Sequence, residues 1–163
     1  MKLSRTSRIV LLISGTIAID QISKVVIRAK MNYGQEIELI GQKFVLQYVN
    51  NKGAFLGMGS DLNPVVRLIF LLILPVVVLG YLIYYIFKNK QLENYALIAL
   101  CMIAGGGIAN VYDRIISGHV TDFLHIDLGG VFRTGIFNLA DMAVTSGMIL
   151  ILFGSLLHRR KKS

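Results

Sequence analysis

Two acidic residues, Asp122 and Asp141, lie beside long apolar stretches near the two ends of the segment 120–141. An acid at the edge of a membrane-spanning sequence is costly and usually has a function. If the two carboxyl groups come within hydrogen-bonding distance, like-charge repulsion makes one of them hold a proton. The ionised carboxylate can then deprotonate water while the protonated one polarises a peptide carbonyl. The pair therefore predicts peptide hydrolysis without a metal ion or a covalent intermediate, although the spacing also allows one acid to pair with Arg114 or Lys24.

The composition is that of a small membrane protein that crosses the bilayer several times. The 163 residues are 55% hydrophobic and 16% charged, and the mean hydropathy is +0.65, which is too apolar for an ordinary soluble domain. The single cysteine, Cys101, excludes an internal disulfide and a cysteine-based metal site. The net charge of +8 comes from basic residues at the ends of apolar runs, so it indicates membrane orientation and not nucleic-acid binding.

Apolar runs at 9–28, 65–87, 94–112 and 139–157 are each long enough to span a bilayer, for which about 20 residues suffice. A cleaved signal peptide is the competing interpretation of the first run, but the run continues past any small-residue cleavage pattern and further spans follow, so we expect a membrane span. Asn63 and Pro64 form a typical helix start, and Pro75 predicts a kink in the second span. The glycines at 105–107 predict close approach of another backbone to the third span.

Two polar segments separate these runs on one side of the membrane. Residues 31–63 contain an alternating stretch, a turn at Gly41 and a stretch rich in strand formers, which predicts a small hairpin or curved sheet on the membrane surface. A partly apolar, glycine-rich loop follows at 51–59, and residues 115–137 form a short outer loop. We therefore expect an all-α membrane protein with four transmembrane helices and a small extracytoplasmic β-hairpin, as a single domain over residues 1–163.

Basic residues indicate the orientation of this domain. The N-terminus, the 88–93 loop and the C-terminal tail together contain nine Lys and Arg, whereas the two opposite loops, counted with Lys30 just before the first, contain four. The termini are therefore expected in the cytoplasm and both acids at the outer face.

Asp20 and Lys24 interrupt the first span four residues apart, with the acid first, which is the favourable order for a helical ion pair. Two interpretations remain open. The pair neutralises itself so that the helix tolerates polar groups near the interface, or it lines a substrate cavity.

Three other chemistries are compatible with parts of the sequence. His119, Asp122 and His125 contain metal-ligand types, but no His-Glu-x-x-His motif accompanies them. Ser117 beside His119 is a poor nucleophile–base pair and reads more simply as a turn. A transporter or proton channel is the non-enzyme alternative, yet it would need polar groups on both sides of the midplane, and the cytoplasmic halves of the spans are almost wholly apolar.

Five polar blocks, taken together and in order, resemble the type II, or lipoprotein, signal peptidases, which are intramembrane aspartyl proteases of bacteria. The blocks are Asp20-Gln21 with Lys24; Asn51-x-Gly53-Ala54; Gly105-Gly106-x-x-Ala109-Asn110-x-x-Asp113-Arg114; Val120-x-Asp122-Phe123; and Phe137-Asn138-x-Ala140-Asp141. The resemblance covers nearly the whole chain.

This resemblance implies a catalytic dyad at Asp122 and Asp141 and no metal or other cofactor. It implies substrate-facing or dyad-supporting roles for Asp20, Lys24, Asn51, Gly106, Asn110, Arg114, Asn138 and Ala140. The family removes the signal peptide from diacylglyceryl-modified prolipoproteins, on the N-terminal side of the lipid-modified cysteine. It acts at the bacterial inner membrane, its first outer segment forms a β-cradle, and the cyclic peptide globomycin inhibits it.

The sequence departs from the family pattern in two places. Phe55 and Leu56 follow the Asn-x-Gly-Ala block where a small residue and then an aromatic one are usual, which bears on how the loop covers substrate. Ala109 stands where glycine is usual before Asn110, which predicts slightly looser helix packing.

Overall fold

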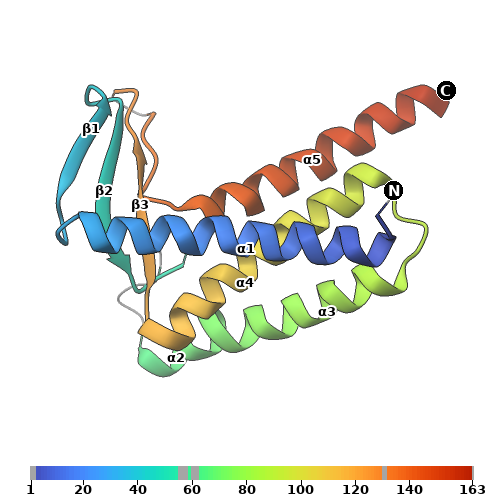
Figure 1. Ribbon diagram of the computed structural model, residues 1–163, viewed down its shortest axis with the longest axis horizontal. Helices are drawn as coiled ribbons and strands as arrows, with labels where there is room; N and C mark the ends of the chain where they lie inside the picture. The colour runs from blue at the N-terminus through green and yellow to red at the C-terminus, as the bar shows by residue number, and fades with distance from the viewer. Residues whose placement is uncertain (1–2, 55–58, 60–62, 130–131, 163) are drawn as a thin grey trace.

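The computed structural model describes residues 3–54, 59, 63–129 and 132–162, and the side chains of 157–162 are outside that description. Four helices run side by side, and a small sheet lies across one end of them (Figure 1). The loop residues Phe55 to Met58, which include the first departure from the family pattern, lie outside the described residues.

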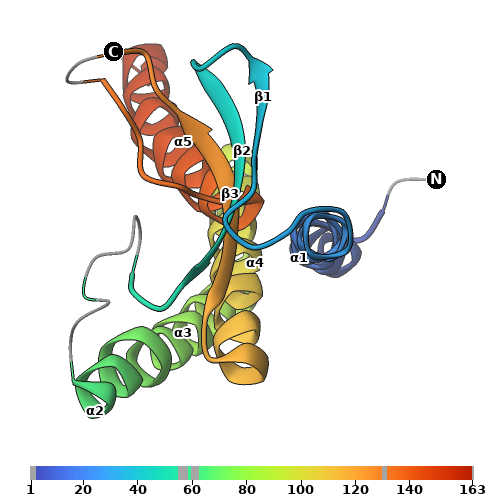
Figure 2. The same cartoon turned by 90° about the vertical axis from the view of Figure 1, so that its left-hand side faces the viewer.

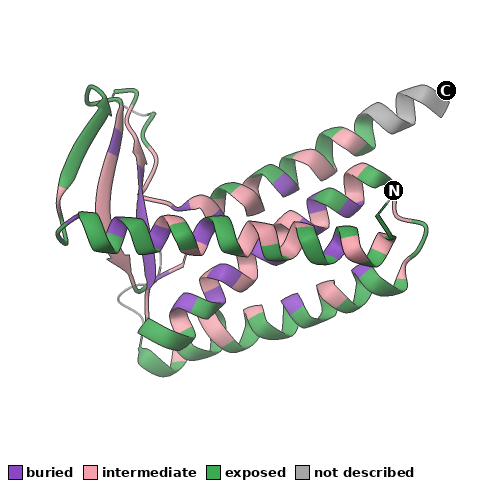
Figure 3. Cartoon of the chain, viewed as in Figure 1, coloured by how far each residue is buried: buried purple, intermediate pink, exposed green. Residues whose placement is uncertain are grey.

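The helices are α1 (Arg5–Lys30), the continuous run α2 (Pro64–Leu68), η2 (Ile69–Ile73) and α3 (Leu74–Lys88), then α4 (Asn94–Ser117) and α5 (Leu139–Lys162). Four stretches are long and apolar enough to cross a membrane: Arg5–Lys30, Pro64–Lys88, Asn94–Ser117 and Leu139–Leu156. Their outer faces carry large exposed apolar side chains, as expected of helices that face lipid (Figure 3).

Local sequence explains how the second span begins and where it is distorted. The Asn63 side chain accepts a hydrogen bond from the Val65 backbone amide at 2.9 Å, and Pro64 takes the first helical turn, as predicted. A π-helical turn over Ile69–Ile73 ends two residues before Pro75, close to the position where the sequence predicted a kink. A proline removes one backbone donor, and a wider turn before it accommodates the ring.

Helix α4 lies in the middle of the bundle, where α1, α3 and α5 all contact it (Figure 2). The predicted close approach at the three glycines is confirmed, because each one faces a different neighbour. A Cβ on Gly105 would lie 2.7 Å from Thr16 in α1, and one on Gly107 would lie 2.6 Å from the Leu79 side chain in α3. A Cβ on Gly106 would collide with the Ala140 carbonyl oxygen in α5.

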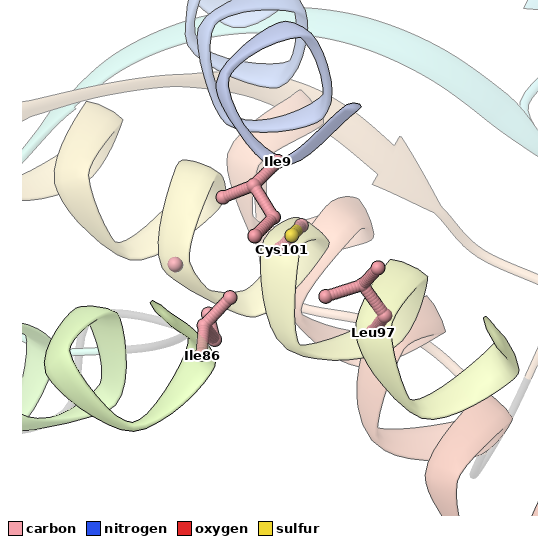
Figure 4. Packing of buried hydrophobic residues seen from close by; sticks show 5 residues of the cluster. Ile9, Ile86, Leu97 and Cys101 are labelled. Atoms are coloured by element: carbon pink, nitrogen blue, oxygen red, sulfur yellow. The ribbon is translucent and has the colours of Figure 1, made fainter. Parts of the chain in front are cut away.

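The end of the bundle away from the sheet is closed by apolar packing. Ile9, Ile86, Leu97 and Cys101 form a buried cluster there together with Ala104 (Figure 4). Both chain ends and the connection from α3 to α4 lie at this same end (Figure 1).

The sheet is antiparallel, with the order β1 (Glu36–Ile40), β2 (Phe44–Asn51) and β3 (Val120–Ile126). The predicted hairpin is therefore present as β1 and β2, and Gly41 in the turn has a φ of +50°. The strand β3 corrects the expectation of a plain outer loop over 115–137. It is buried on both faces over its first five residues, so it lacks the alternation that marks a half-exposed strand.

A second apolar cluster fixes the sheet to the helices. Ile27 and Met31 at the end of α1 pack with Phe123 and Leu124 of β3. This cluster holds β3 against the bundle, and β3 carries one of the two acids of interest.

Candidate active site

The polar site lies where the sheet meets the helices, and α1 supplies its innermost charges. Asp20 and Lys24 form the predicted ion pair, with 2.7 Å between Lys24 Nζ and the Asp20 carboxylate. Both residues are 0% exposed. Lys24 Nζ also lies 2.7 Å from the Asp113 carboxylate and donates to Asn110 Oδ1 at 3.0 Å. A buried ammonium is tolerated only when its donors are satisfied, and Lys24 meets that condition with three oxygen partners.

Helix α4 contributes Asn110, Asp113 and Arg114 from within its last two turns. The sequence suggested that these residues end the third span, but the helix continues to Ser117 and stops at Gly118, whose φ is +72°. Their spacing of three and four residues places them on neighbouring faces of one helix. Asp113 accepts a second hydrogen bond from Gln21 Nε2 at 3.0 Å.

Strand β3 positions Asp122, which is only 2% exposed. In the register of the sheet, Asp122 lies opposite Val49 and diagonal to Asn51, so side chains on that face reach one another. Asn51 Nδ2 donates to Asp122 Oδ2 at 2.8 Å, and Asn138 Nδ2 donates to Asp122 Oδ1 at 2.6 Å.

The start of α5 positions Asp141 through a reciprocal cap. The Asn138 side-chain oxygen accepts from the Asp141 backbone amide at 2.9 Å, and Asp141 Oδ2 accepts from the Asn138 backbone amide at 3.2 Å. This arrangement is a capping box built from Asn and Asp. Asp20 of α1 also accepts a hydrogen bond from the Ala140 backbone amide at 2.8 Å, so α1 and α5 are joined at this turn.

A short chain of amides links the two acids. Asn110 Nδ2 donates to Asp141 Oδ1 at 2.9 Å, and Asn138 Nδ2 donates to both Asn110 Oδ1 and Asp122 Oδ1. Asn138 therefore contacts both carboxyl groups directly. Each carboxylate oxygen of the pair has an N–H donor, so the pair is held in place by neutral groups and by hydrogen bonds from three different elements.

The electrostatics of Asp122 follow from its burial. Loss of hydration is the main cause that raises the pKa of Asp122 to about 7, and the charge of Asp141 adds to the increase. Hydrogen bonds from Asn51 and Asn138, and the positive charge of Lys24, act in the opposite direction. Near neutral pH this carboxyl group therefore holds a proton in a large fraction of molecules.

Arg114 joins the loop after β2 to helix α4. Its Nη2 donates to the Gly53 carbonyl at 2.9 Å and its Nη1 to the Asn110 carbonyl at 3.3 Å. Asn51 fixes the same loop by donating to the Ala54 carbonyl at 3.0 Å and accepting from the Gly53 amide at 2.8 Å. The beginning of this loop is therefore ordered by the residues that surround Asp122.

Two cavities reach Asp141 from adjoining faces of α5. One of about 640 Å³ lies between η2, α4 and α5, and its polar wall is formed by Asn110, Arg114 and Asp141. The other, of about 470 Å³, extends toward the β3–α5 connection and is lined by Phe137 and Thr145 among others. Both are mainly apolar, and Asp141 and Thr145 belong to both. Asp141 is thus the acid open to a ligand, whereas Asp122 lines neither of these two cavities and is buried.

The predicted residues divide into two groups by burial. Asp20, Lys24, Asn138 and Ala140 are each 0% exposed, and Gly106 is buried against Ala140, so these residues support the site and do not face a substrate in this structure. Asn51, Asn110, Arg114 and Asp141 are partly exposed. Ala109, the second departure from the family pattern, is completely buried, and its carbonyl accepts a hydrogen bond from Gln21 at 3.4 Å.

Sequence reasoning did not assign roles to Gln21, Asp113 and Thr121. Asp113 is the second carboxylate on Lys24, and it accepts a long hydrogen bond of 3.5 Å from the Thr121 amide at the start of β3. Arg28 donates to the Thr121 hydroxyl at 3.1 Å. Asp113 was visible as part of the third polar block, but only the fold reveals that it faces Lys24.

The alternative chemistries do not gain support from this geometry. Asp122 and His125 are three residues apart on a strand, so they point to opposite faces. Within the described ranges, no three His, Cys, Asp or Glu side chains gather closely enough to hold a metal ion. Ser117, Gly118 and His119 form the turn that ends α4, as the sequence indicated.

Comparison with known proteins identifies the family. The model of the family described as signal peptidase (SPase) II matches residues 12–157. Lipoprotein signal peptidases from Pseudomonas aeruginosa (strain UCBPP-PA14), Fusobacterium nucleatum and Clostridium novyi are each 33% identical to this chain, over 89%, 88% and 87% of it and over 84%, 83% and 93% of their own lengths.

The fold agrees with this result. Two solved structures of a bacterial membrane enzyme superpose on the chain with TM-scores of 0.82 and 0.79, at 27% and 26% identity. The alignments cover 96% and 92% of this chain, and 92% and 93% of those chains. The expectation of four membrane helices with a small sheet is confirmed. The transporter alternative is not supported, and the chain belongs to the signal peptidase II family, the lipoprotein signal peptidases of bacterial membranes.

Proposed function

We propose that this signal peptidase is an aspartic endopeptidase whose catalytic pair is Asp122 and Asp141. The observation that supports this proposal most directly is the position of Asn138, which donates a hydrogen bond to each carboxyl group, at 2.6 Å to Asp122 and 3.2 Å to Asp141. Two carboxyl groups held by one residue share an environment in which one proton is retained. The asparagine donors lower the pKa of Asp122, but they add no positive charge that would favour ionisation of both acids.

Each member of the pair has a distinct role in the proposed reaction. Asp122 is buried and carries the proton, so it donates a hydrogen bond to the carbonyl oxygen of the scissile bond. Asp141 lines both cavities, so it takes a proton from the attacking water. The water oxygen bonds to the carbonyl carbon, and the tetrahedral intermediate collapses as the C–N bond breaks. The proton gained by Asp141 passes to the amide nitrogen as this bond breaks, so the leaving group departs as a neutral amine.

The substrate proposed is a diacylglyceryl-modified prolipoprotein, cleaved on the N-terminal side of its lipid-modified cysteine. The apolar cavity between η2, α4 and α5 suits a substrate segment that enters from the bilayer. An extended substrate backbone in such an environment needs partners for its amides and carbonyls. Asn51, Asn110 and Arg114 are the partly exposed polar groups that can supply them. Globomycin-type cyclic peptides are expected to occupy the same cavity and to compete with substrate, and membrane lipid is the surrounding partner.

The proposed location is the bacterial cytoplasmic membrane, with both termini in the cytoplasm and the active site at the outer face. Arg5, Arg8, Lys88 and Lys90 lie in segments at the end of the bundle that also holds both chain ends (Figure 1). Basic residues concentrate on the cytoplasmic side of membrane proteins. The sheet and the acids are at the opposite end, and residues 1–163 act as one domain in this proposal.

The test compares wild type with Asp122→Asn and Asp141→Asn, all purified in detergent with a metal chelator. Each change keeps the size of the side chain but removes a titratable acid. Wild type is expected to cleave a diacylglyceryl-modified precursor, and each variant is expected to lose at least about 1,000-fold in kcat, the scale of loss for a residue that acts in the chemical step. The Asp127→Asn variant, altered at an acid just beyond β3, is the control and should retain activity. Near-normal turnover by either dyad variant would refute the assignment.

A further inference from the structure

A separate basic pocket of about 370 Å³ lies beside the active site, where α2 and η2 approach the end of α4. Its polar wall consists of Lys52, Arg67, Arg114, Ser117 and His119. Its other wall is formed mainly by Leu68, Leu71 and Leu72. The described lining residues include no Asp or Glu, so the lining itself is positively charged.

The pocket lies at one end of a helix that is long and apolar enough to cross a membrane. It is at the first turns of the Pro64–Lys88 span, where Val65 is 63% exposed, Leu68 is 49% exposed and Phe70 is 57% exposed. These apolar side chains face outward from the helix, while Lys52 and Ser117 on the polar wall of the pocket are exposed. A site with cations at one side and leucines at the other matches the division of a phospholipid into a phosphate group and acyl chains.

Arg114 provides an independent indication of a ligand. Its two terminal nitrogens donate to the Gly53 and Asn110 carbonyls, but its Nε is buried and has no hydrogen-bond partner within the described part of the chain. A buried N–H without an acceptor costs about 1–3 kcal/mol, and a guanidinium is well suited to a phosphate oxygen. Arg114 lines the pocket, so a phosphate bound there would bring oxygen atoms close to this guanidinium.

We infer that this pocket binds the phosphate group of an anionic phospholipid, with Lys52, Arg67, Arg114 and His119 around the phosphate and the leucines against the first part of the acyl chains. Basic pockets between membrane helices bind anionic headgroups by this combination of charge and apolar contact. The inference does not depend on the catalytic roles of Asp122 and Asp141. It adds a consequence for them, because Lys52 directly follows Asn51, which donates to Asp122, and Arg114 donates to the Gly53 carbonyl in the same loop.

The test is a binding measurement, so it does not depend on catalysis. Delipidated protein in neutral detergent is titrated with dioleoyl phosphatidylglycerol, and bound lipid is counted by native mass spectrometry. One lipid is expected to bind to wild type more tightly than all others. The Lys52→Gln/Arg67→Gln double variant should weaken that first binding event about 30-fold, from the contribution of two basic residues near a lipid surface.

The matched control is Lys88→Gln/Lys90→Gln, which removes the same charge at the far end of the bundle and should leave the first binding event unchanged. The single variant Lys52→Glu changes an exposed residue, so it tests the pocket even if the double variant is unstable, and it should also lose the first lipid. Equal losses in the control pair would refute the inference, since binding would then reflect net charge alone.

Two further arms distinguish the source of the anion. Inorganic phosphate at the same concentration should displace little of the lipid, and phosphatidylcholine should bind more weakly than phosphatidylglycerol. Displacement by inorganic phosphate would assign the pocket to a soluble anion and overturn the lipid assignment. If the double variant binds lipid as wild type does but has a higher KM for substrates that carry acidic residues after the cleavage site, the pocket would be assigned to the substrate peptide instead.

Discussion

Asn51→Ala is expected to move the alkaline limit of activity upward, because Asn51 stabilises the charged form of Asp122. The Asn51 amide donates to Asp122 at 2.8 Å. Burial raises the pKa of Asp122 to about 7, and this hydrogen bond opposes the increase. If the active pair holds one proton and Asp122 carries it, activity falls as pH rises through that value. Removing the donor raises the pKa of Asp122, and the pair keeps its proton to a higher pH.

The size of this change follows from one hydrogen bond to an ionised acceptor. Such a bond contributes about 1.5–3 kcal/mol, and the lower end applies here because Asn51 is only partly buried and water can replace part of the interaction. One pKa unit corresponds to about 1.4 kcal/mol. The alkaline limb of the pH profile should therefore move upward by about one pH unit.

The measurement is kcat/KM for a diacylglyceryl-modified fluorogenic peptide between about pH 5.5 and 9.5, because kcat/KM reports the free enzyme. Asn51 also faces the proposed substrate, so the height of the profile is expected to fall, and only the position of its alkaline limb is the test. Asn50→Ala is the matched control, since Asn50 is the neighbouring asparagine of β2 and its partner across the sheet is Thr121, not Asp122. A limb that stays in place or moves downward in Asn51→Ala would refute the reasoning.

Three other substitutions probe the structure around the pair. The folded-state pKa of Asp122 is raised from 3.8 to about 7, so this carboxyl group stabilises the folded protein below pH 3.8 and loses that contribution as the pH rises toward 7. Relative to Asp122→Asn, wild type should therefore lose up to about 4 kcal/mol of folding stability between about pH 4 and pH 8. Gly106→Ala should reduce activity at least about 100-fold by pushing α5 away from α4 and misplacing Asp141, the proposed catalytic base, whereas the atoms nearest to a Cβ at Gly107 belong to the flexible Leu79 side chain, so Gly107→Ala should cost far less. Lys24→Met leaves two buried carboxylates without their cation and should destabilise the protein by about 3–5 kcal/mol, or about 10 °C in Tm.

Each of these has a direct measurement. Thermal unfolding in detergent at several pH values tests the predicted loss of wild-type stability with rising pH, and a constant stability difference between Asp122→Asn and wild type would contradict that prediction. Turnover of Gly106→Ala and Gly107→Ala tests the predicted effect of the α4–α5 contact on activity. Equal losses in the two variants would contradict it. The predicted destabilisation by Lys24→Met is tested by thermal unfolding, with Arg28→Gln as the control because Arg28 is an exposed cation on the same helix. Similar Tm values for the two variants would contradict the prediction.

The sequence predicted the features that depend on short spacings. Asp20 and Lys24 are one helical turn apart, so their pairing followed from the helix alone, and three adjacent small residues in the third span were enough to indicate close helix packing. The hairpin was predicted in the same way, since β1 and β2 are separated by a few residues with a glycine at the turn. Local pattern was sufficient wherever the partners were close in sequence.

Features that join distant segments were not predictable in this way. Strand β3 was missed because it is buried on both faces over its first five residues and pairs with β2, about 70 residues earlier, so neither alternation nor a nearby turn marked it. The second carboxylate on Lys24 is on another helix, and Asn138 reaches Asp122 across 16 positions of the chain. The polar blocks indicated which residues matter, but the fold decided which of them support the site and which face the cavity.

The charges buried at this site favour retention of one proton by the acid pair. Lys24 lies between the carboxylates of Asp20 and Asp113, so these three groups together carry a net negative charge. The positive charge of Arg114 neutralises that net charge but leaves nothing to balance the acid pair. With Asp122 and Asp141 both ionised, the cluster would hold four negative and two positive charges in a poorly hydrated region. One proton on the pair halves the excess, and the asparagine amides hold the two carboxyl groups in place without adding charge. A substitution that adds a cation next to Asp122, such as Asn51→Lys, should therefore weaken this proton and lower activity at neutral pH, although it would improve the charge balance of the folded protein.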